Sequence, residues 1–184
     1  ASDEPNATIF SKDDLFISGT GKLTVNSNYN NAITSKDDLE IGEANIDITS
    51  VADGLRGKDS ITITSGNINI NATGDGMKSN NSEDAEKGYV LIKDGTINIT
   101  SGEDGIQAET NATITGGELT INSGGGSENS SKSSSWGNFG KSMFGQNNNT
   151  STEEDTPSAK GIKGGTLVKV DAGNINIANA AKSI

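Results

Sequence analysis

Residues 53–77 read DGLRGKDSITITSGNININATGDGM, which is one complete repeat of the chain followed by the start of the next. The stretch begins at Asp53-Gly54-Leu55 and reaches the same kind of corner again at Asp75-Gly76-Met77, 22 residues later. Between the corners, isoleucines alternate with polar residues in two short runs that a glycine separates. A fixed period of roughly 20 to 50 residues is typical of a solenoid, so this stretch predicts stacked, similar turns of chain.

The same corner recurs along nearly the whole sequence. The equivalent apolar corner residues are Ile9, Ile33, Leu55, Met77, Ile106, Ile162 and Ile184, at steps of 24, 22, 22, 29, 56 and 22 residues. The step of 29 exceeds 22 by seven residues, which fall around 82–87. The step of 56 exceeds it by thirty-four, which match the Ser-, Asn- and Gly-rich segment 125–158. We expect this segment to leave the solenoid as a long flexible insert.

Each repeat contains two apolar-x-apolar pairs, and such period-two alternation is the pattern of a β-strand. The first pairs are Leu15/Ile17, Leu39/Ile41, Ile61/Ile63, Val90/Ile92, Ala112/Ile114 and Val168/Val170. The second pairs are Leu23/Val25, Ile46/Ile48, Ile68/Ile70, Ile97/Ile99, Leu119/Ile121 and Ile175/Ile177. Because no stretch shows a 3.6-residue period, we expect almost no helix.

An antiparallel meander is the alternative, since Asp-Gly between alternating runs is also a hairpin pattern. The apolar positions recur every 22 residues in the same order, which a coil that stacks on itself explains directly. The sequence therefore predicts an all-β fold, a right-handed parallel β-helix of about six 22-residue coils. We expect residues 1–8 to form an N-terminal tail and residues 9–184 a single β-helix domain, interrupted at 125–158.

Composition excludes several classes of function. The chain has 25 acidic and 14 basic residues, a net charge of −11, which argues against nucleic acid as a partner. It has neither cysteine nor histidine, so thiol catalysis, zinc-thiolate sites and Ser-His nucleophiles are excluded. No apolar run is long enough to predict a membrane span. The start at Ala1, without Met, is that of a processed or engineered end, and we expect an extracellular or cell-surface protein.

Stacking the repeats places three carboxylates in one column, Asp53, Asp75 and Asp104, with Asn31 as a neutral first member. Two carboxylates about 5 Å apart repel by roughly 3 kcal/mol at an effective dielectric constant near 20. A Ca²⁺ ion between successive coils would remove this repulsion, with Glu103 and main-chain carbonyls as further oxygen ligands. The alternative is that each Asp bonds only its own turn while glycine supplies a positive φ.

Two further columns carry charge. Asp13/Asp14, Asp37/Asp38 and Asp59 each follow a lysine, at Lys12, Lys36 and Lys58, so local neutralisation makes a metal less necessary there. Arg56, Lys78, Gln107 and Lys163 follow the acidic corner. These basic residues are either charge partners of the neighbouring Asp residues or, for Arg56 and Lys78, ligands for the carboxylates of uronic-acid sugars.

An outward-facing polar column lies between the apolar residues of the second pairs: Asp47, Asn69, Asn98, Thr120 and Asn176. It is either an amide ladder on a solvated sheet or a track that binds an extended polysaccharide, and both interpretations stay open. Within the insert, Trp136, Phe139 and Phe144 could stack on sugar rings or form a disordered contact site.

The repeat and its acidic corner resemble the bacterial extracellular carbohydrate-binding β-helix family. Its coils carry Asp-Gly-Ile corners and Gly-x-Ile-x-Ile strands, matched here by Asp104-Gly105-Ile106 and by residues 66–70 and 95–99. The resemblance covers nearly all of residues 9–184 except the insert. It implies calcium between coils and binding of cellulose-like or acidic, pectin-like polysaccharide at a cell surface, on a fold similar to pectate lyases. Residues 159–162 and 181–184 depart from the corner pattern, which puts metal binding there in doubt.

Three functions are therefore compared. We expect calcium-dependent, non-catalytic polysaccharide binding. The first alternative is a calcium-assisted uronate lyase with Arg56 or Lys78 as its base, and the second is a structural surface spacer or adhesin. We also expect self-association or further chain to cover the open edge of the last coil near Ile184.

Overall fold

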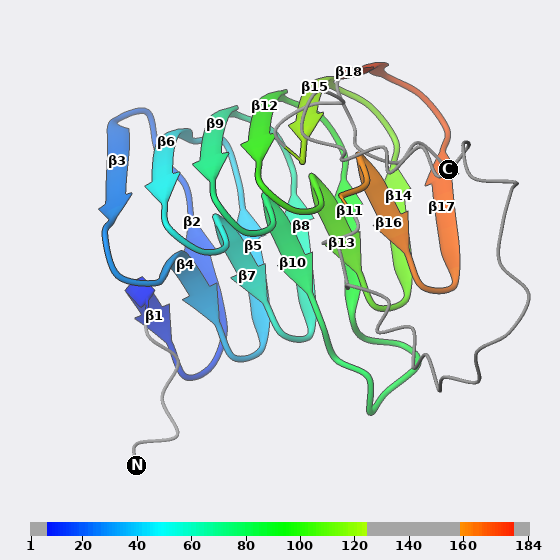
Figure 1. The fold of residues 1–184 in the computed structure, drawn as a ribbon, viewed down its shortest axis with the longest axis horizontal. Coiled ribbons are helices and arrows are strands. Elements are labelled where there is room, and N and C mark those ends of the chain that lie inside the picture. The colour runs from blue at the N-terminus through cyan, green and yellow to red at the C-terminus, as the bar shows by residue number, and fades with distance from the viewer. Residues whose placement is uncertain (1–6, 125–158, 179–184) are drawn as a thin grey trace, which may run out of the picture.

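The computed structural model describes residues 7–124 and 159–178, and every regular element in these ranges is a β-strand. The strands form three parallel sheets of six strands each (Figure 1). Sheet A contains β1 (Ala7–Ser11), β4 (Asn31–Ser35), β7 (Leu55–Gly57), β10 (Met77–Ser79), β13 (Ile106–Ala108) and β16 (Ile162–Gly164). Sheet B contains β2 (Leu15–Ile17), β5 (Asp38–Ile41), β8 (Ser60–Ile63), β11 (Tyr89–Ile92), β14 (Asn111–Ile114) and β17 (Leu167–Val170). Sheet C contains β3 (Lys22–Ser27), β6 (Asn45–Ser50), β9 (Asn67–Ala72), β12 (Thr96–Ser101), β15 (Glu118–Ser123) and β18 (Asn174–Ala178).

The chain visits the sheets in the order A, B, C and then pairs with its own previous turn, which makes the fold a parallel β-solenoid. The predicted columns pair in register: Leu39 lies beside Ile61, and Ile46 beside Ile68. The all-β, parallel prediction is therefore confirmed, and the meander alternative is wrong. The right-handed sense of winding stays a prediction.

Sheet A is the part of the fold that the sequence analysis did not resolve. The predicted corner residues, such as Leu55 and Met77, each begin a strand of only three residues in the middle of this sheet. Three residues give a single alternation, which is too little to distinguish a strand from a turn. The first strand also begins at Ala7, two residues before the predicted start of the domain.

The core is one narrow column of aliphatic side chains that point inward from all three sheets. Its fully buried members include Ile33, Leu39, Ile41, Ile46, Leu55, Ile61, Ile63, Ile68, Met77, Ile92 and Ile97. Since each turn needs only a few inward residues, a chain that is 30% hydrophobic can enclose a continuous core. At the far end of the solenoid, Val168, Val170 and Ile177 are exposed, and what covers them stays a prediction.

The corner glycines are required by close approach of successive turns. A Cβ on Gly76 would lie 2.4 Å from Ile99 Cγ2 and 2.5 Å from the carbonyl oxygen of Gly105. Gly54 and Gly105 meet the same two kinds of atom. These corner glycines are not among the glycines with positive φ, which corrects the idea that they supply a left-handed turn. Positive φ occurs instead at the turn from sheet B to sheet C, for example at Gly66 and Gly95.

The part of the chain that the structure describes contains no helix long and apolar enough to cross a membrane.

Replacing Gly76 by Ala should lower the free energy of unfolding by about 1–3 kcal/mol, because the new methyl group has neither space nor a flexible neighbour to displace. Gly21→Ala is the matched control, since a Cβ there meets nothing within 4 Å. Urea unfolding monitored by circular dichroism measures both. Equal stability of the two variants would contradict the tight stacking at the corner.

Candidate functional site

The predicted acidic column exists, and its carboxylates bond the main chain of the next turn. Asn31 Oδ1 accepts the backbone N–H of Asp53 at 3.1 Å, and Asp53 Oδ1 accepts that of Asp75 at 3.0 Å. Asp75 Oδ1 accepts the N–H of Asp104 at 2.9 Å, and Asp104 Oδ1 accepts that of Lys160 at 2.7 Å. Each side chain in this corner ladder therefore satisfies a buried N–H of the following repeat rather than its own turn.

The second oxygen of each carboxylate lies near a basic side chain. Lys78 Nζ lies 2.6 Å from Asp75 Oδ2, and Arg56 Nη1 lies 3.7 Å from Asp53 Oδ2. Lys163 Nζ lies 3.6 Å from Asp104 Oδ2. Of the two interpretations of the basic column, charge pairing with the Asp residues is the one that the structure shows.

Burial and pairing shift the ionisation of the corner ladder. Burial raises the pKa of Asp53 above its ordinary value, against the opposing effect of Lys78. Burial likewise raises the pKa of Asp104. Although burial opposes its charged form, the hydrogen bond to Asp75 leaves the pKa of Lys78 above its ordinary value. Lys78 is therefore held as a cation at neutral pH.

A hard cation at the corner ladder would have to take the place of these basic side chains. The oxygens suit Ca²⁺ in type, but Arg56, Lys78 and Lys163 already supply the positive charge that the column needs. The side chain of Glu103 is exposed, and partial loss of solvent together with the negative charge of Asp75 raises its pKa. Calcium at Asn31, Asp53, Asp75, Asp104 and Glu103 stays a prediction.

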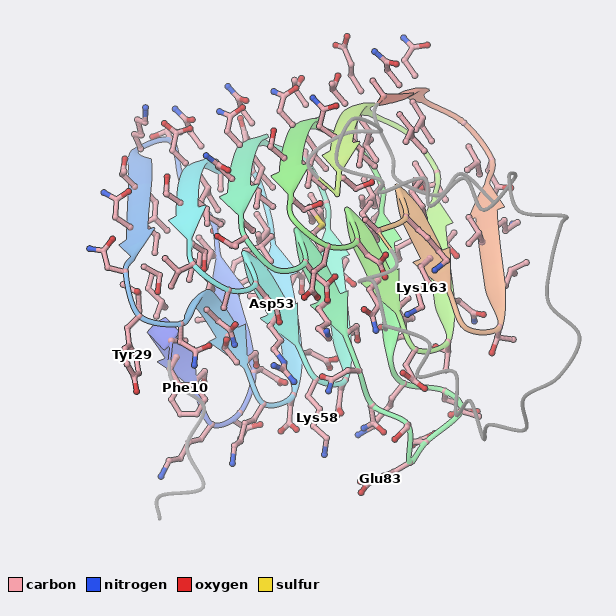
Figure 2. All side chains as sticks on the ribbon, viewed as in Figure 1. Phe10, Tyr29, Asp53, Lys58, Glu83 and Lys163 are labelled. Carbon is pink, nitrogen blue, oxygen red and sulfur yellow. The ribbon has the colours of Figure 1, made fainter. Side chains whose placement is uncertain are left out.

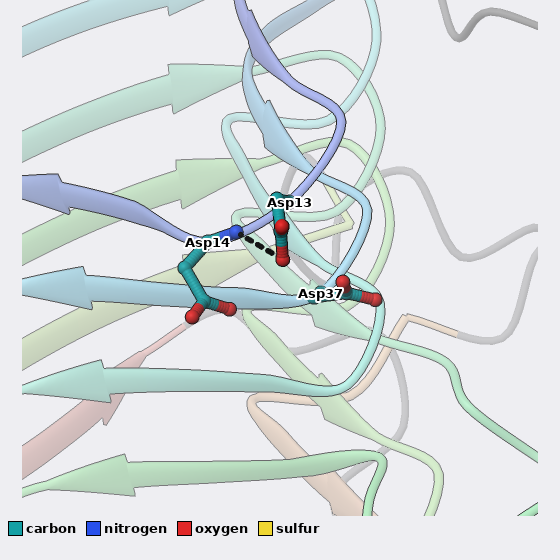
Figure 3. A group of neighbouring side chains, drawn as sticks. All are labelled: Asp13, Asp14 and Asp37. Atoms are coloured by element: carbon teal, nitrogen blue, oxygen red, sulfur yellow. Dashed lines mark hydrogen bonds between the residues drawn. The ribbon is translucent and has the colours of Figure 1, made fainter.

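A second group of carboxylates lies at the turn from sheet A to sheet B near the N-terminal end (Figure 3). One oxygen each from Asp13, Asp14 and Asp37 lie within 4.8 Å of one another. Loss of solvent raises the pKa of Asp37, and the neighbouring carboxyl of Asp13 adds to this effect. These residues belong to the predicted second acidic column, which the sequence makes the weaker candidate for a metal site. Asp59, the next member of this column, differs from the other three. It pairs with Lys87 and accepts a hydrogen bond from Asn81.

The outer face of sheet C carries three parallel columns of polar residues. Side chains stand away from this sheet along the upper side of the view in Figure 2. In the central column, Asn69 Nδ2 donates to Asp47 Oδ1 at 2.8 Å, and Asn98 Nδ2 donates to Asn69 Oδ1 at 2.9 Å. Lys22 pairs with Asp47, and this contact together with the amide of Asn69 holds the pKa of Asp47 below its ordinary value. The predicted amide ladder is therefore present.

On either side of this ladder lie two more polar columns in register. One consists of Lys22, Asn45, Asn67, Thr96, Glu118 and Asn174, and the other begins Asn26, Thr49, Asn71, Thr100 and Asn122. A shallow depression of about 490 Å³ runs over the middle of this face between Asp47, Thr49, Asn71 and Thr100. We call the whole surface the amide face. No aromatic residue occurs in any strand of sheet C.

One predicted feature lies outside the described residues, and one feature of the structure was not predicted. Trp136, with Phe139 and Phe144, lies outside the described residues. A column of buried serines at the ends of the sheet C strands was missed, although Ser27, Ser50, Ser101 and Ser123 recur at matching positions in the repeat. Ser50 Oγ, for example, donates to the carbonyl oxygen of Asp53 at 2.9 Å and so supports the acidic corner from inside.

Comparison with known proteins identifies the family of this chain. Residues 1–184 match the family described as carbohydrate-binding domain-containing protein. The chain belongs to this family. A carbohydrate-binding domain-containing protein of Acetivibrio thermocellus is 48% identical to it over 122 residues, which are 66% of this chain and 43% of the relative. Carbohydrate binding is thus the shared description of the family and of this relative.

A solved structure is also similar. It is that of a gadolinium derivative of the polysaccharide lyase-like protein from C. thermocellum. The TM-score is 0.66 and the sequence identity 32%, over 99% of this chain and 57% of that one. This chain therefore spans less than half of the curated relative and a little over half of the solved protein.

Asp53→Asn tests whether the corner ladder depends on hydrogen bonding or on charge. Asn keeps an Oδ1 acceptor for Asp75, as Asn31 already does for Asp53, and removes a carboxylate whose pKa is raised. Because the pKa of Asp53 is higher in the folded protein, ionisation of this carboxyl destabilises the folded state at pH values above that pKa. The destabilisation disappears as the pH falls toward 3.8, the ordinary pKa of the group. We expect Asp53→Asn to melt slightly above the wild type at pH 7 and equally at pH 4.

Asp53→Ala is the companion variant. It leaves the buried N–H of Asp75 without an acceptor and should lose about 1–3 kcal/mol of unfolding free energy. Thermal melts followed by calorimetry compare the three proteins. Asp53→Asn as destabilised as Asp53→Ala would show that the charge, and not the hydrogen bond, is what the corner needs.

Proposed function

We propose that the chain is a non-catalytic polysaccharide-binding module and that the amide face holds the glycan. The observation that carries this proposal is the set of three polar columns, which recur once per strand along a flat parallel sheet. Amides and hydroxyls spaced about 4.8 Å apart can bond the hydroxyl groups of an extended chain at many equivalent points. Family membership supports a carbohydrate as the ligand.

The proposal includes the class of glycan and its location. Neutral cellulose-like chains suit the amides and hydroxyls of the middle of the face, where Asn69, Asn71, Asn98 and Thr100 lie. Acidic, pectin-like chains suit Arg56 and Lys78 on sheet A only when these side chains exchange their Asp partners for uronate carboxylates. An extracellular or cell-surface location follows from such polymers as ligands and is part of the same proposal.

A polysaccharide lyase is the second candidate, because the similar solved structure is that of a polysaccharide lyase-like protein. Its chemistry needs a base that removes a proton next to the uronate carboxylate. Lys78 is a poor base, since its pKa is raised by its contact with Asp75 and it stays protonated at neutral pH. Arg56 is a guanidinium that does not lose its proton in proteins. These two residues therefore favour binding over catalysis.

We further propose that Ca²⁺ stabilises the solenoid. Asp13, Asp14 and Asp37 offer three carboxylate oxygens close together, the donor type that Ca²⁺ prefers, so they are the first place at which to seek it. The corner ladder is the second place, where the ion would replace basic side chains. Bound calcium would neutralise stacked carboxylates and tie neighbouring turns together.

Asn69→Ala combined with Asn98→Ala tests the amide face. Each substitution removes hydrogen bonds worth about 1 kcal/mol, so the double variant should bind a soluble glycan roughly thirtyfold more weakly. Thr62→Ala combined with Thr113→Ala, on the outer face of sheet B, is the matched control. Glycan-array screening identifies the ligand and isothermal calorimetry measures its affinity.

Equal losses in the two double variants, or no retention on any glycan, would contradict binding at the amide face. A reducing-end assay on the same glycans, with and without chelator, separates binding from cleavage. Release of product by the wild type would favour the lyase.

Chelation tests the role of calcium. We expect the melting temperature to fall in EDTA and to be restored by added Ca²⁺, because a ligand that binds only the folded state stabilises it. Asp37→Asn should abolish this difference, whereas Asp75→Asn should keep it. If Asp75→Asn abolished the difference and Asp37→Asn kept it, the ion would lie at the corner ladder. An unchanged melting temperature of the wild type in EDTA would contradict calcium binding altogether.

A further inference from the structure

One polar column of the amide face alternates strictly between asparagine and threonine. In register from one turn to the next, its members are Asn26, Thr49, Asn71, Thr100 and Asn122. The first four are exposed and the fifth is half-buried. We call this set the alternating column. Its pattern repeats every second turn, about 9.6 Å, whereas the fold repeats every turn, so the fold alone does not require the alternation.

The central column of the same face shows what stacking by itself favours. There Asn98 donates to Asn69, and Asn69 donates to Asp47, so that each amide holds the next. In the alternating column no asparagine lies beside another, and no hydrogen bond joins Asn71 to the threonines on either side of it. The amide of Asn71 and the two hydroxyls are therefore available to bind a ligand.

The central and alternating columns border the shallow depression of the amide face. Its lining includes Asp47, Asn69 and Asn98 on one side and Thr49, Asn71 and Thr100 on the other. These residues come from β6, β9 and β12, so the depression runs along the solenoid axis, across the strands. Neighbouring outward residues of one strand are about 6.6 Å apart, which leaves room for a single chain of sugar rings. Asp47 is the one carboxylate in this lining, and Lys22 neutralises it, which suits a neutral polymer.

An extended β-1,4-linked glycan has the same two-step alternation as the column. Each of its sugars is rotated by half a turn relative to the next, so one edge of the chain presents a vicinal diol and a hydroxymethyl group in turn. Each sugar advances by close to one strand spacing, about 4.8 Å, so that one sugar lies over each turn of the solenoid. An amide offers a donor and an acceptor to the two hydroxyls of a diol, whereas a threonine hydroxyl suits a single hydroxyl group.

We propose that the alternating column determines the linkage of the glycan: a β-1,4-linked chain lies along the solenoid axis with one sugar per turn. Asn71 binds the diol edge of one sugar, and Thr49 and Thr100 bind the hydroxymethyl groups of the sugars before and after it. This inference rests on the proposed function and adds the direction of the chain and the residues that determine specificity. Because the strands of sheet C contain no aromatic residue, these hydrogen bonds rather than ring stacking provide the discrimination.

Isothermal titration of the full chain with four soluble pentasaccharides at pH 7 tests the inference. Cellopentaose is β-1,4-linked, xylopentaose has the same linkage without hydroxymethyl groups, laminaripentaose is β-1,3-linked and maltopentaose is α-1,4-linked. We expect cellopentaose to bind about tenfold more tightly than the last two, whose sugars do not alternate by half a turn, and about fivefold more tightly than xylopentaose. Longer cello-oligosaccharides should gain little affinity, because the alternating column has five members.

Asn71→Thr tests the amide of the alternating column. It replaces the group that bonds the diol and interrupts the alternation, so it should weaken cellopentaose binding about tenfold. Asn111→Thr makes the same exchange in strand β14 of sheet B, away from the amide face, and is the matched control. It should leave the affinity for cellopentaose within about twofold of that of the wild type.

Thr49→Val combined with Thr100→Val tests the two hydroxyls. Both residues are exposed, so the melting temperature should not fall. The affinity for cellopentaose should drop to that for xylopentaose, while xylopentaose binding stays as in the wild type, because only the contacts with the hydroxymethyl groups are lost. Thr62→Val combined with Thr113→Val, on sheet B, should keep the wild-type preference for cellopentaose.

The outcomes separate this inference from the proposed function. If Asn69→Ala with Asn98→Ala weakens glycan binding but Asn71→Thr does no more than Asn111→Thr, the glycan binds the amide face and the inference is wrong. Equal affinity for cellopentaose and laminaripentaose, or an unchanged preference for cellopentaose over xylopentaose in the threonine double variant, would also overturn it. Binding of none of the four pentasaccharides, with retention of another glycan on the array, would overturn the inference and leave the proposed function in place.

Discussion

The fold depends on the close stacking of each turn of chain on the equivalent residues of the turn before it. Strands about 4.8 Å apart bring like residues into contact, so every side chain must be compatible with its own repetition. Isoleucine satisfies this requirement inside the solenoid, glycine at the corner where Gly76 meets Gly105, and asparagine on the outside. Stacked carboxylates repel one another and need partners. In the corner ladder, Asp53, Asp75 and Asp104 therefore bond main-chain N–H groups and basic side chains.

Much of this architecture could be predicted from the sequence, because stacking imposes its period on the residue pattern. The apolar pairs of sheets B and C, the parallel register and the acidic column all follow from a repeat of 22 residues. The amide ladder could also be predicted, since Asn69 and Asn98 alternate with buried isoleucines. The strands of sheet A could not, because a strand such as Leu55–Gly57 contains a single alternation.

The candidate sites were harder to predict than the fold, for a physical reason. Sequence period tells which residues stack, but not which atom of a side chain faces which partner. Asp75 could have faced a metal ion, its own turn or Lys78, and only the structure shows one oxygen on the Asp104 N–H and the other on Lys78. A pocket that Thr34 and Asn80 line joins residues from four successive turns, and no sequence pattern indicates that the Thr34 hydroxyl lacks a partner.

The three surfaces of the solenoid therefore differ in chemistry although one repeat builds them all. Sheet C presents mainly amides and hydroxyls, the corner presents paired charges, and the outer side of sheet A presents a pocket lined by basic side chains. The most direct test of the central claim, that the amide face holds the glycan, is a map of side-chain amide NMR signals during titration with a soluble oligosaccharide. Our account predicts saturable shifts of the Nδ2 hydrogens of Asn69, Asn71 and Asn98. Shifts confined to sheets A or B, with the amides of sheet C unchanged at saturation, would contradict it.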